Sequence, residues 1–254
     1  MYIEQWKYIA DYHTHTCFSH GRGTVDDNVR AALARGLTTI GIADHGPANW
    51  WNVGIKRIAD FERLIEEVWR ARRRFPEIQI LAGVEANIIS YDGELDVPEA
   101  VQEQLDQVLV GFHTMIIPKS WGDGLRFIRL SLAARLGERR FSEAKRAHTQ
   151  ALIAAIQRYR IFAVTHPGLR IAIDSEALAK VCAMRQTALE INARHGLASP
   201  ELIRHAAGCG VRFILSSDAH RPEEVGRLEP AEAAARAAGL TVEQIINVRE
   251  LPEA

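Results

Sequence analysis

Seven short apolar runs alternate with amphipathic helical stretches along this chain, and this alternation constrains its fold more than any other feature. The apolar runs cover residues 8–12, 38–42, 78–84, 107–112, 161–164, 187–189 and 211–215, and helical patterns cover residues 25–35, 58–74, 175–184 and 200–207. The order strand, helix, strand predicts right-handed βαβ units around a parallel sheet. Seven units in 254 residues favour an α/β barrel of the TIM type, one unit short of eight. An open, doubly wound sheet is the competing fold.

The composition indicates one domain of ordinary globular type, residues 1–254. Hydrophobic residues make up 47% of the chain and charged residues 25%, which argues against a disordered protein. We find no internal repeat and no Gly/Pro/Ser-rich linker that would divide it. The formal net charge of -1 provides no overall field that would recruit nucleic acid or an anionic membrane.

Cysteine usage and hydropathy indicate a cellular compartment. The three cysteines form no CxxC pair, which is typical of a reducing environment. The chain contains no run of about 18 apolar residues, the length that a transmembrane helix needs. Residues 1–12 lack the apolar core of a signal peptide. We therefore expect a cytoplasmic protein without a membrane partner. The oligomeric state is left open.

Side chains that can bind metals follow the ends of most predicted strands. Seven of the ten histidines lie at or just after such an end, together with two carboxylates; the nine residues are His13, His15, His20, His45, Glu85, His113, His166, Asp218 and His220. Because the C-terminal ends of parallel barrel strands converge on one face, we expect these side chains to meet there. His13 and His15 point the same way, since they are two residues apart on an extended segment. Nine nitrogen and oxygen donors are enough for three divalent cations.

Several neighbours of these residues have expected roles beside the metals. Asp44 adjoins His45, so strand alternation turns it away from the site and favours a supporting role. Glu190 ends the sixth predicted strand and has a supporting, substrate-facing or purely structural role. The cations that could bind a substrate phosphate are Arg22, Arg170 and Arg194.

Aromatic residues near the site and the remaining histidines complete the set of candidates. Trp50 and Trp51, after the second strand, either wall the pocket or pack under their loop. His195 is expected in a loop close to the site. His148 and His205 are expected on helix surfaces, where they would have no part in the chemistry.

The gap between His113 and His166 is too long for one strand–helix unit. It spans 53 residues, and residues 114–150 form a basic insert with one or two expected helices over the same barrel face. Its cations are Arg126, Arg129, Arg135, Arg139, Arg140, Lys145 and Arg146. The insert is either a solvated face or a lid that attracts anions.

The motifs at the strand ends resemble those of the PHP (polymerase and histidinol phosphatase) phosphoesterases, in family order and over almost the whole chain. They are His-Thr-His at 13–15 together with His20, DHGP at 44–47, GVEAN at 83–87, GFH at 111–113, THPG at 165–168 and SDAH at 217–220. The segment DGELD at 92–96 is most similar to the stand-alone, YcdX-like and histidinol-phosphatase-like members. The resemblance implies a distorted (β/α)7 barrel and a trinuclear site for zinc, manganese or iron.

The resemblance also implies how the metals divide the nine ligands. The first metal would take His13, His15, Glu85 and Asp218; the second would share Glu85 and add His113 and His166; the third would take His20, His45 and His220. A hydroxide held between two metals bridged by Glu85 would attack a phosphoryl group. We accordingly expect Glu85, Asp218 and His220 to be catalytic.

Four functions are compatible with these residues. The first is a phosphomonoesterase that acts on a small phosphorylated metabolite such as histidinol phosphate. The second is a phosphodiesterase or exonuclease for nucleotides or short oligonucleotides, for which the basic insert would serve. An amidohydrolase also begins with HxH, but its bridging lysine is absent here, because the fourth strand ends in His113. A non-enzymatic metal-binding barrel is disfavoured, because structural zinc sites are normally closed.

Overall fold

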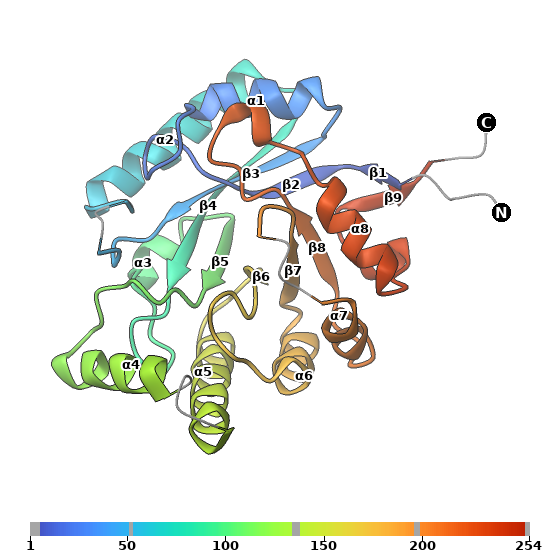
Figure 1. Ribbon diagram of the computed structural model, residues 1–254. Helices are drawn as coiled ribbons and strands as arrows, with labels where there is room; N and C mark the ends of the chain where they lie inside the picture. Colours follow the sequence, from blue (N-terminus) through green and yellow to red (C-terminus); the bar gives the residue numbers. More distant parts are fainter. Residues whose placement is uncertain (1–5, 51–52, 134–137, 196–198, 252–254) are drawn as a thin grey trace.

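Seven parallel strands form a nearly closed barrel in the computed structural model, which describes residues 6–50, 53–133, 138–195 and 199–251 (Figure 1). The strands are β2 (Ala10–Thr14), β3 (Thr39–His45), β4 (Gln79–Asn87), β5 (Gln107–Gly111), β6 (Ala163–Val164), β7 (Ala188–Asn192) and β8 (Phe213–Ser216). They lie side by side in chain order, without the reversal that an open doubly wound sheet requires. The prediction of a single-domain, seven-stranded TIM-like barrel is therefore confirmed.

The barrel closes between its first and last strands with few backbone bonds. The peptide nitrogen of His15 donates to the carbonyl of Ala219 over 2.8 Å, and the nitrogen of Ala219 donates to the carbonyl of His13 over 3.3 Å. The buried Asp11 carboxylate adds a side-chain connection. It accepts hydrogen bonds from the Ser217 nitrogen at 3.2 Å, from the Ser217 hydroxyl and from the Gly226 nitrogen at 2.8 Å. One carboxylate thus joins β2 to the chain around β8.

Eight helices surround the barrel in the described part of the chain (Figure 1). They are α1 (Val25–Ala34), α2 (Ile58–Arg74), α3 (Glu99–Gln102), α4 (Trp121–Ala133), α5 (Glu138–Arg158), α6 (Ser175–Arg185), α7 (Pro200–Ala207) and α8 (Glu229–Ala237). Thr24 caps α1 through a capping box with Asp27, and Gly36 follows its end with a φ of 71°, in the left-handed region that glycine tolerates. In the described residues, no helix is long and apolar enough to cross a membrane.

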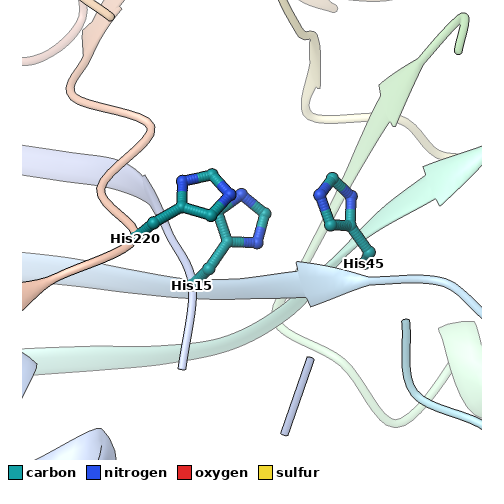
Figure 2. A group of neighbouring side chains, drawn as sticks. All are labelled: His15, His45 and His220. Atoms are coloured by element: carbon teal, nitrogen blue, oxygen red, sulfur yellow. The ribbon is translucent and has the colours of Figure 1, made fainter. Parts of the chain in front are cut away.

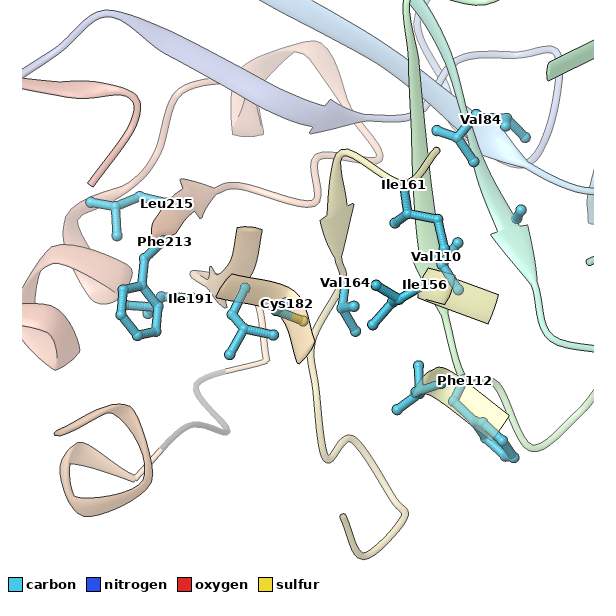
Figure 3. Close-up of a cluster of buried hydrophobic side chains, with 14 of the residues drawn as sticks. Val84, Val110, Phe112, Ile156, Ile161, Val164, Cys182, Ile191, Phe213 and Leu215 are labelled. Atoms are coloured by element: carbon cyan, nitrogen blue, oxygen red, sulfur yellow. The ribbon is translucent and has the colours of Figure 1, made fainter. Parts of the chain in front are cut away.

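The strands carry two different faces, because successive side chains alternate. Their outward residues, among them Val84, Val110 and Leu215, pack against helices in the main core, which also contains Ile156 of α5 and Cys182 of α6 (Figure 3). Their inward residues form a small separate cluster of Ala43, Leu109, Ala163, Ala188 and Ile214. Further along the same inward faces, the strands end in the histidines and carboxylates noted above.

A short antiparallel pair outside the barrel was not predicted. Trp6–Tyr8 (β1) pairs with Val248–Glu250 (β9), so the first and last described segments lie side by side. The first apolar run, expected as one strand over residues 8–12, is therefore divided between β1 and β2. The other six strands occur where expected, with bounds that differ by a few residues.

Candidate metal centre

The inward faces of the barrel strands bring the nine predicted ligands to one mouth. His13 belongs to β2, His45 ends β3 and Glu85 lies in β4. The others lie in the loops that follow β2, β5, β6 and β8; they are His15, His20, His113, His166, Asp218 and His220. Figure 2 shows the rings of His15, His45 and His220 turned toward a common centre from three separate segments. Ring centroids of His15 lie 4.4 Å from those of both His45 and His220.

Glu85 lies among most of the histidines and is fully buried. Its Oε1 is 2.8 Å from Nε2 of His166 and accepts a 2.7 Å hydrogen bond from the Thr165 hydroxyl. Its Oε2 is 2.8 Å from Nδ1 of His45 and 3.4 Å from Nε2 of His13. A single carboxylate therefore touches ligands from several strands, as a bridging ligand must.

Gly111 is required where Glu85 and His113 approach each other. A Cβ at this position would lie 2.5 Å from the His113 ring and 2.9 Å from Glu85 Oε1. No side chain fits there without displacing one of them. The glycine at the end of β5 thus allows Nε2 of His113 to lie 3.5 Å from the Glu85 carboxylate.

A second group gathers around Asp218. Nε2 of His15 lies 3.1 Å from Nε2 of His13 and 3.2 Å from Oδ1 of Asp218. Asp218 itself has a φ of 54°, in the left-handed region that is uncommon for residues other than glycine but that aspartate adopts more readily than most. The three residues offer ligand atoms within 4.8 Å of one another, as do His15, His45 and His220, and also His45, Glu85 and His113.

His20 adjoins this cluster at its edge, where its side chain is partly exposed and partly covered. Its ring stacks on that of His45, with centroids 4.9 Å apart and planes 8° apart, and lies 4.2 Å from the ring of His220. Burial, together with the neighbouring rings of His220 and His45, lowers the pKa of His20 to about 4. The ring is therefore neutral at pH 7, the form that binds a metal.

Charges in the buried cluster favour ionised carboxylates. Burial opposes the charged form of Glu85, but the surrounding histidines, first His13 and then His113, hold its pKa well below the usual range. The pKa of Asp218 is lowered for the same reason, chiefly by His13. Burial lowers the pKa of His15, and the neighbouring His45 lowers it further. Burial opposes the charged form of His13, but Glu190, Glu85 and Asp218 raise its pKa well above the usual value. Divalent cations require anionic oxygens and neutral imidazoles, so binding of a metal here would release the proton of His13.

Unpaired polar atoms test whether a metal fits this site. Nδ1 of His15 is buried and has no hydrogen-bond partner, and the buried Nδ1 of His45 and Oε2 of Glu85, although 2.8 Å apart, are not aligned for a hydrogen bond. An unsatisfied buried polar atom costs about 1–3 kcal/mol, so such atoms rarely collect without a ligand. Their imidazole and carboxylate chemistry suits zinc, manganese and iron. The residues therefore fit the metal centre that the sequence predicts.

Strand β7 provides no expected ligand but supports three of them. Nδ1 of His13 forms a 2.7 Å hydrogen bond with Oε1 of Glu190, and the backbone nitrogen of His166 donates to Oε2 of Glu190 at 2.5 Å. Asn192 donates to Oε2 of Glu190 at 3.0 Å and to Oδ2 of Asp218 at 3.3 Å. Glu190 thus has the supporting role that was one of its three expected roles. A carboxylate on one ring nitrogen of His13 would leave the other nitrogen to face a bound metal.

Replacement of Glu190 by glutamine is expected to weaken metal binding about 10–100-fold, the usual cost of losing such a partner. Chelator competition followed by elemental analysis measures this affinity directly. Glu201→Gln, on the exposed face of α7, is the matched control and should leave it unchanged. Equal metal affinity in Glu190→Gln and the unaltered protein would contradict the role assigned to Glu190.

Two further carboxylates hold the loops that carry ligands. Asp44 is buried and accepts hydrogen bonds from the Thr16 nitrogen at 2.8 Å, the Thr16 hydroxyl at 2.6 Å and the Ser19 nitrogen at 3.1 Å. It thereby fixes the loop between His15 and His20, in agreement with its predicted supporting role. The second carboxylate, Asp96, was not predicted.

Asp96 connects the loops after β3 and β4. It accepts hydrogen bonds from the Ala48 nitrogen at 2.9 Å and from the nitrogen and amide of Asn87 at 2.8 and 2.6 Å. The Asn87 oxygen in turn lies 2.7 Å from Nδ1 of His113. Asn87 is two residues after Glu85 on the same strand face, and this spacing was the signal available in the sequence.

Replacement of Asp96 by asparagine is expected to remove a pH dependence of stability. Burial raises the pKa of Asp96 from 3.8 to about 6. Because the folded state holds this proton more tightly, the stabilisation is complete below about pH 4 and is lost as pH rises through about 6. The unfolding free energy of the protein relative to Asp96→Asn should fall by about 1–3 kcal/mol over this window. Urea unfolding at both ends of the window measures it, and a constant difference would contradict the raised pKa.

The predicted substrate-binding cations occupy different positions around the mouth. The Arg22 nitrogen donates to the His220 carbonyl at 2.8 Å, which places this exposed residue beside a ligand. Arg170 is exposed after the His166 loop, with a φ of 58°. Arg194 contacts the Asp218 carbonyl at 3.4 Å and Glu224 at 3.0 Å. His195 lies close to the site as expected, with Nε2 3.2 Å from Oδ2 of Asp218.

The prediction that His148 lies on a helix surface is wrong. Its side chain is buried, its Nδ1 donates a 3.2 Å hydrogen bond to the Ala172 carbonyl, and its ring packs 5.0 Å from the Phe112 ring. The face of α5 that carries it is covered rather than solvated. His205 is exposed on α7 as expected. Trp50 is exposed after β3, whereas Trp51 lies outside the described residues.

The region of the basic insert contains α4 and the first part of α5. Several of its cations contact other residues of the chain: Arg126 lies over the Tyr91 ring, Arg129 pairs with Glu143 at 3.1 Å, and Lys145 lies 4.0 Å from Asp174. Arg139, Arg140 and Arg146 are exposed, and Arg135 lies outside the described residues.

Comparison with known proteins identifies the family. A family model described as the PHP domain matches residues 11–193, which is most of the chain. The chain belongs to the PHP family. The match includes β2 to β7, and the barrel places Asp218 and His220, which follow it in the sequence, against the matched ligands.

Relatives of this PHP protein align along most of their lengths. A "Probable phosphatase" of Shewanella sediminis is 31% identical over 266 residues, which cover 98% of this chain and 92% of the relative. Another, of Acetivibrio thermocellus, is 31% identical over 234 residues, covering 88% and 84%. The expectation that the protein is a metal-dependent hydrolase of phosphoric esters is therefore confirmed.

A solved structure shares the fold of this PHP protein at low sequence identity. It is histidinol phosphate phosphatase of Lactococcus lactis, complexed with zinc, L-histidinol and phosphate. The TM-score is 0.62 and the identity 16%, with 92% of this chain and 95% of that chain covered. The likeness confirms the distorted barrel.

Proposed function

We propose that this protein is a phosphomonoesterase that hydrolyses a small phosphorylated metabolite at a site for three divalent cations. The observation that carries the proposal is the convergence of nine histidine and carboxylate ligands on one barrel mouth, with buried donor atoms left unpaired. One ion would be held by His13, His15, Glu85 and Asp218, a second by Glu85, His113 and His166, and a third by His20, His45 and His220. Zinc, manganese and iron all suit these donors.

The chain contributes positioning and charge to the reaction. When bound, divalent cations supply a water of lowered pKa as nucleophile and neutralise phosphate oxygens. Glu85 contacts ligands of all three groups and sets their spacing, while Glu190 and Asn87 orient the rings of His13 and His113. Asp218 is held ionised by His13. These fixed contacts are made before substrate arrives, so little reorganisation accompanies the reaction.

Arginines at the mouth would bind the phosphate. Arg22 is beside His220, and Arg170 follows the His166 loop. Neither guanidinium has an ion-pair partner among the described residues, so both are available for bidentate contact with phosphate oxygens. Arg194 already contacts Glu224, and we assign it a weaker part.

The preference for a small monoester rests on two observations. The solved neighbour with the same fold contains L-histidinol and phosphate. The cations on which an oligonucleotide would depend are partly engaged within the chain, as in the pairs Arg129–Glu143 and Lys145–Asp174. A nucleotide or oligonucleotide diester is the alternative substrate. The free thiols of Cys17, Cys182 and Cys209 are consistent with a reducing compartment such as the cytoplasm.

Initial rates on a monoester and a diester test the proposal. Enzyme loaded with manganese or zinc is assayed with histidinol phosphate, p-nitrophenyl phosphate and bis-p-nitrophenyl phosphate, and elemental analysis counts the metals. We expect kcat/KM for a monoester to exceed that for the diester roughly 100-fold, and Asp218→Asn to abolish both, since it removes a ligand charge. A faster diester reaction would establish the alternative, and fewer than three ions in the active enzyme would contradict the trinuclear site.

A further inference from the structure

Helix α4 has two apolar faces, and only one of them is covered. Phe127 and Leu130 are buried, and the Phe127 ring packs 4.7 Å from that of Tyr91 and 5.6 Å from that of Phe112. These contacts fix the helix on the outside of the barrel, where Figure 1 shows it at the periphery beside α5. The opposite face carries a second set of large apolar residues.

This second face is a narrow, continuous seam of four residues. Trp121, Leu125, Ile128 and Leu132 are exposed by 93%, 69%, 59% and 54%. They are separated by four, three and four residues, the spacing of the positions that meet a partner helix in a coiled coil. A lipid-facing helix has a wider apolar face with basic residues around it. We refer to these four residues as the α4 seam.

The sides of the α4 seam suit close approach by another helix. Gly122 and Gly124 flank its first half, and a Cβ at Gly122 would meet nothing closer than 3.7 Å, so there is free space beside Trp121. Arg129 flanks the second half, but its charge is paired with Glu143 of the same chain. Among the described residues, no unpaired cation at this flank repels an identical surface.

The exposed area matches what a stable interface needs. The four seam residues expose on the order of 500 Å² of apolar side chain, given about 150–250 Å² for a tryptophan and about 100 Å² for each exposed aliphatic. A standard interface buries about 800 Å² per partner, of which roughly 60% is apolar. Single exposed apolar residues are ordinary on a protein surface, whereas a contiguous patch of several hundred Å² is often functional.

We propose that the α4 seam packs against the same seam of a second copy of this chain. A self-complementary surface of one helix, symmetric about its middle, forms an isologous antiparallel interface in which Trp121 of one copy lies beside Leu132 of the other. This inference is independent of the proposed function. It concerns assembly, and it does not require that the seam touch the substrate.

Molar mass in solution tests the proposal. Light scattering after size exclusion, from about 1 to 100 μM, should give more than one chain per particle for the unaltered protein. Leu125→Glu with Ile128→Glu should reduce it to one chain, because two carboxylates would be buried opposite two others. Met184→Glu, which also changes an exposed apolar helix residue, is the matched control and should retain the assembly. Thermal unfolding confirms that the variants are folded.

A second variant keeps the proposal testable if the double glutamate variant does not fold. Trp121→Ser alters a side chain that is 93% exposed, so it should leave the thermal midpoint unchanged and weaken self-association by tenfold or more. A single-chain mass of the unaltered protein at about 100 μM, or an assembly that both seam variants retain, would overturn the proposal. So would a monomer that binds anionic lipid vesicles and loses that binding in Trp121→Ser, which would make the seam a membrane contact.

Discussion

Glu85→Gln is expected to reduce kcat/KM by roughly 10³-fold or more, because loss of even one preorganised contact to reacting groups commonly costs 10²–10³. The substitution keeps the shape of the side chain and removes its charge. That charge lies 2.8 Å from His166, 2.8 Å from His45 and 3.4 Å from His13. No other carboxylate in the described residues touches ligands of all three proposed metal groups, so its neutralisation should affect every ion.

Two measurements separate loss of metal from loss of fold in Glu85→Gln. Elemental analysis should show reduced metal content, while the far-ultraviolet circular dichroism stays native. Glu103→Gln is the control, because Glu103 is exposed after α3, at the barrel end where β5 begins. Full activity in Glu85→Gln would exclude the role of Glu85 as a shared ligand.

Asp11→Ala is expected to lower the free energy of unfolding by about 3 kcal/mol or more. The Asp11 carboxylate accepts three hydrogen bonds that connect β2 to Ser217 and Gly226. Its removal leaves those buried donors without partners, at a cost of about 1–3 kcal/mol each. In a protein of this length the loss corresponds to a fall in the thermal midpoint of roughly 6–12 °C.

Thermal and urea unfolding measure the effect of Asp11→Ala. Asp92→Ala, in an exposed loop position, should change the midpoint by less than about 1 °C. A midpoint that is equally insensitive to Asp11→Ala would show that backbone contacts alone close the barrel. The substitution is also expected to lower activity, since Asp11 anchors the strand that carries His13.

The barrel could be predicted from sequence because its signal is local and repeated. Each strand is a short apolar run and most connecting helices have one apolar face, so the order of elements and the single domain followed directly. The pair β1 and β9 was missed because two three-residue strands from opposite ends of the chain gain their regular structure only from each other. The bounds of β3 were placed too early, because His45 reads as a polar end although it continues the strand.

The candidate site was predictable to the extent that its residues follow strand ends. The nine proposed ligands could be predicted in this way, but not all of the residues that hydrogen-bond to them could. Asn87 and Asn192 lie two residues after Glu85 and Glu190, so strand alternation places them on the same faces as these carboxylates. This spacing could have predicted that they lie at the site, but it was not used. Asp96 lies in the loop nine residues after Asn87, and only the folded chain shows that it contacts both Asn87 and Ala48, which is 48 residues away.

The structure changes the interpretation of the insert at two places, the position of His148 and the character of the exposed face of α4. Its composition suggested a charged surface, but helical periodicity places residues of different kind on different faces. The buried face of α5 takes His148 into the aromatic cluster with Tyr91 and Phe112. The exposed face of α4 is apolar. A count of arginines along the segment could not separate these faces.

The pairing of β1 with β9 bears on how this protein could be joined to others. Since β1 leads into the start of β2, the two ends of the described chain lie at the barrel end opposite the mouth (Figure 1). A fused domain or an affinity tag at either end would therefore leave access to the ligands open. Adjacent ends also suit circular permutation, in which a short linker joins them and a new opening is cut in a surface loop. In such a permutant the β1–β9 pair would become an internal hairpin.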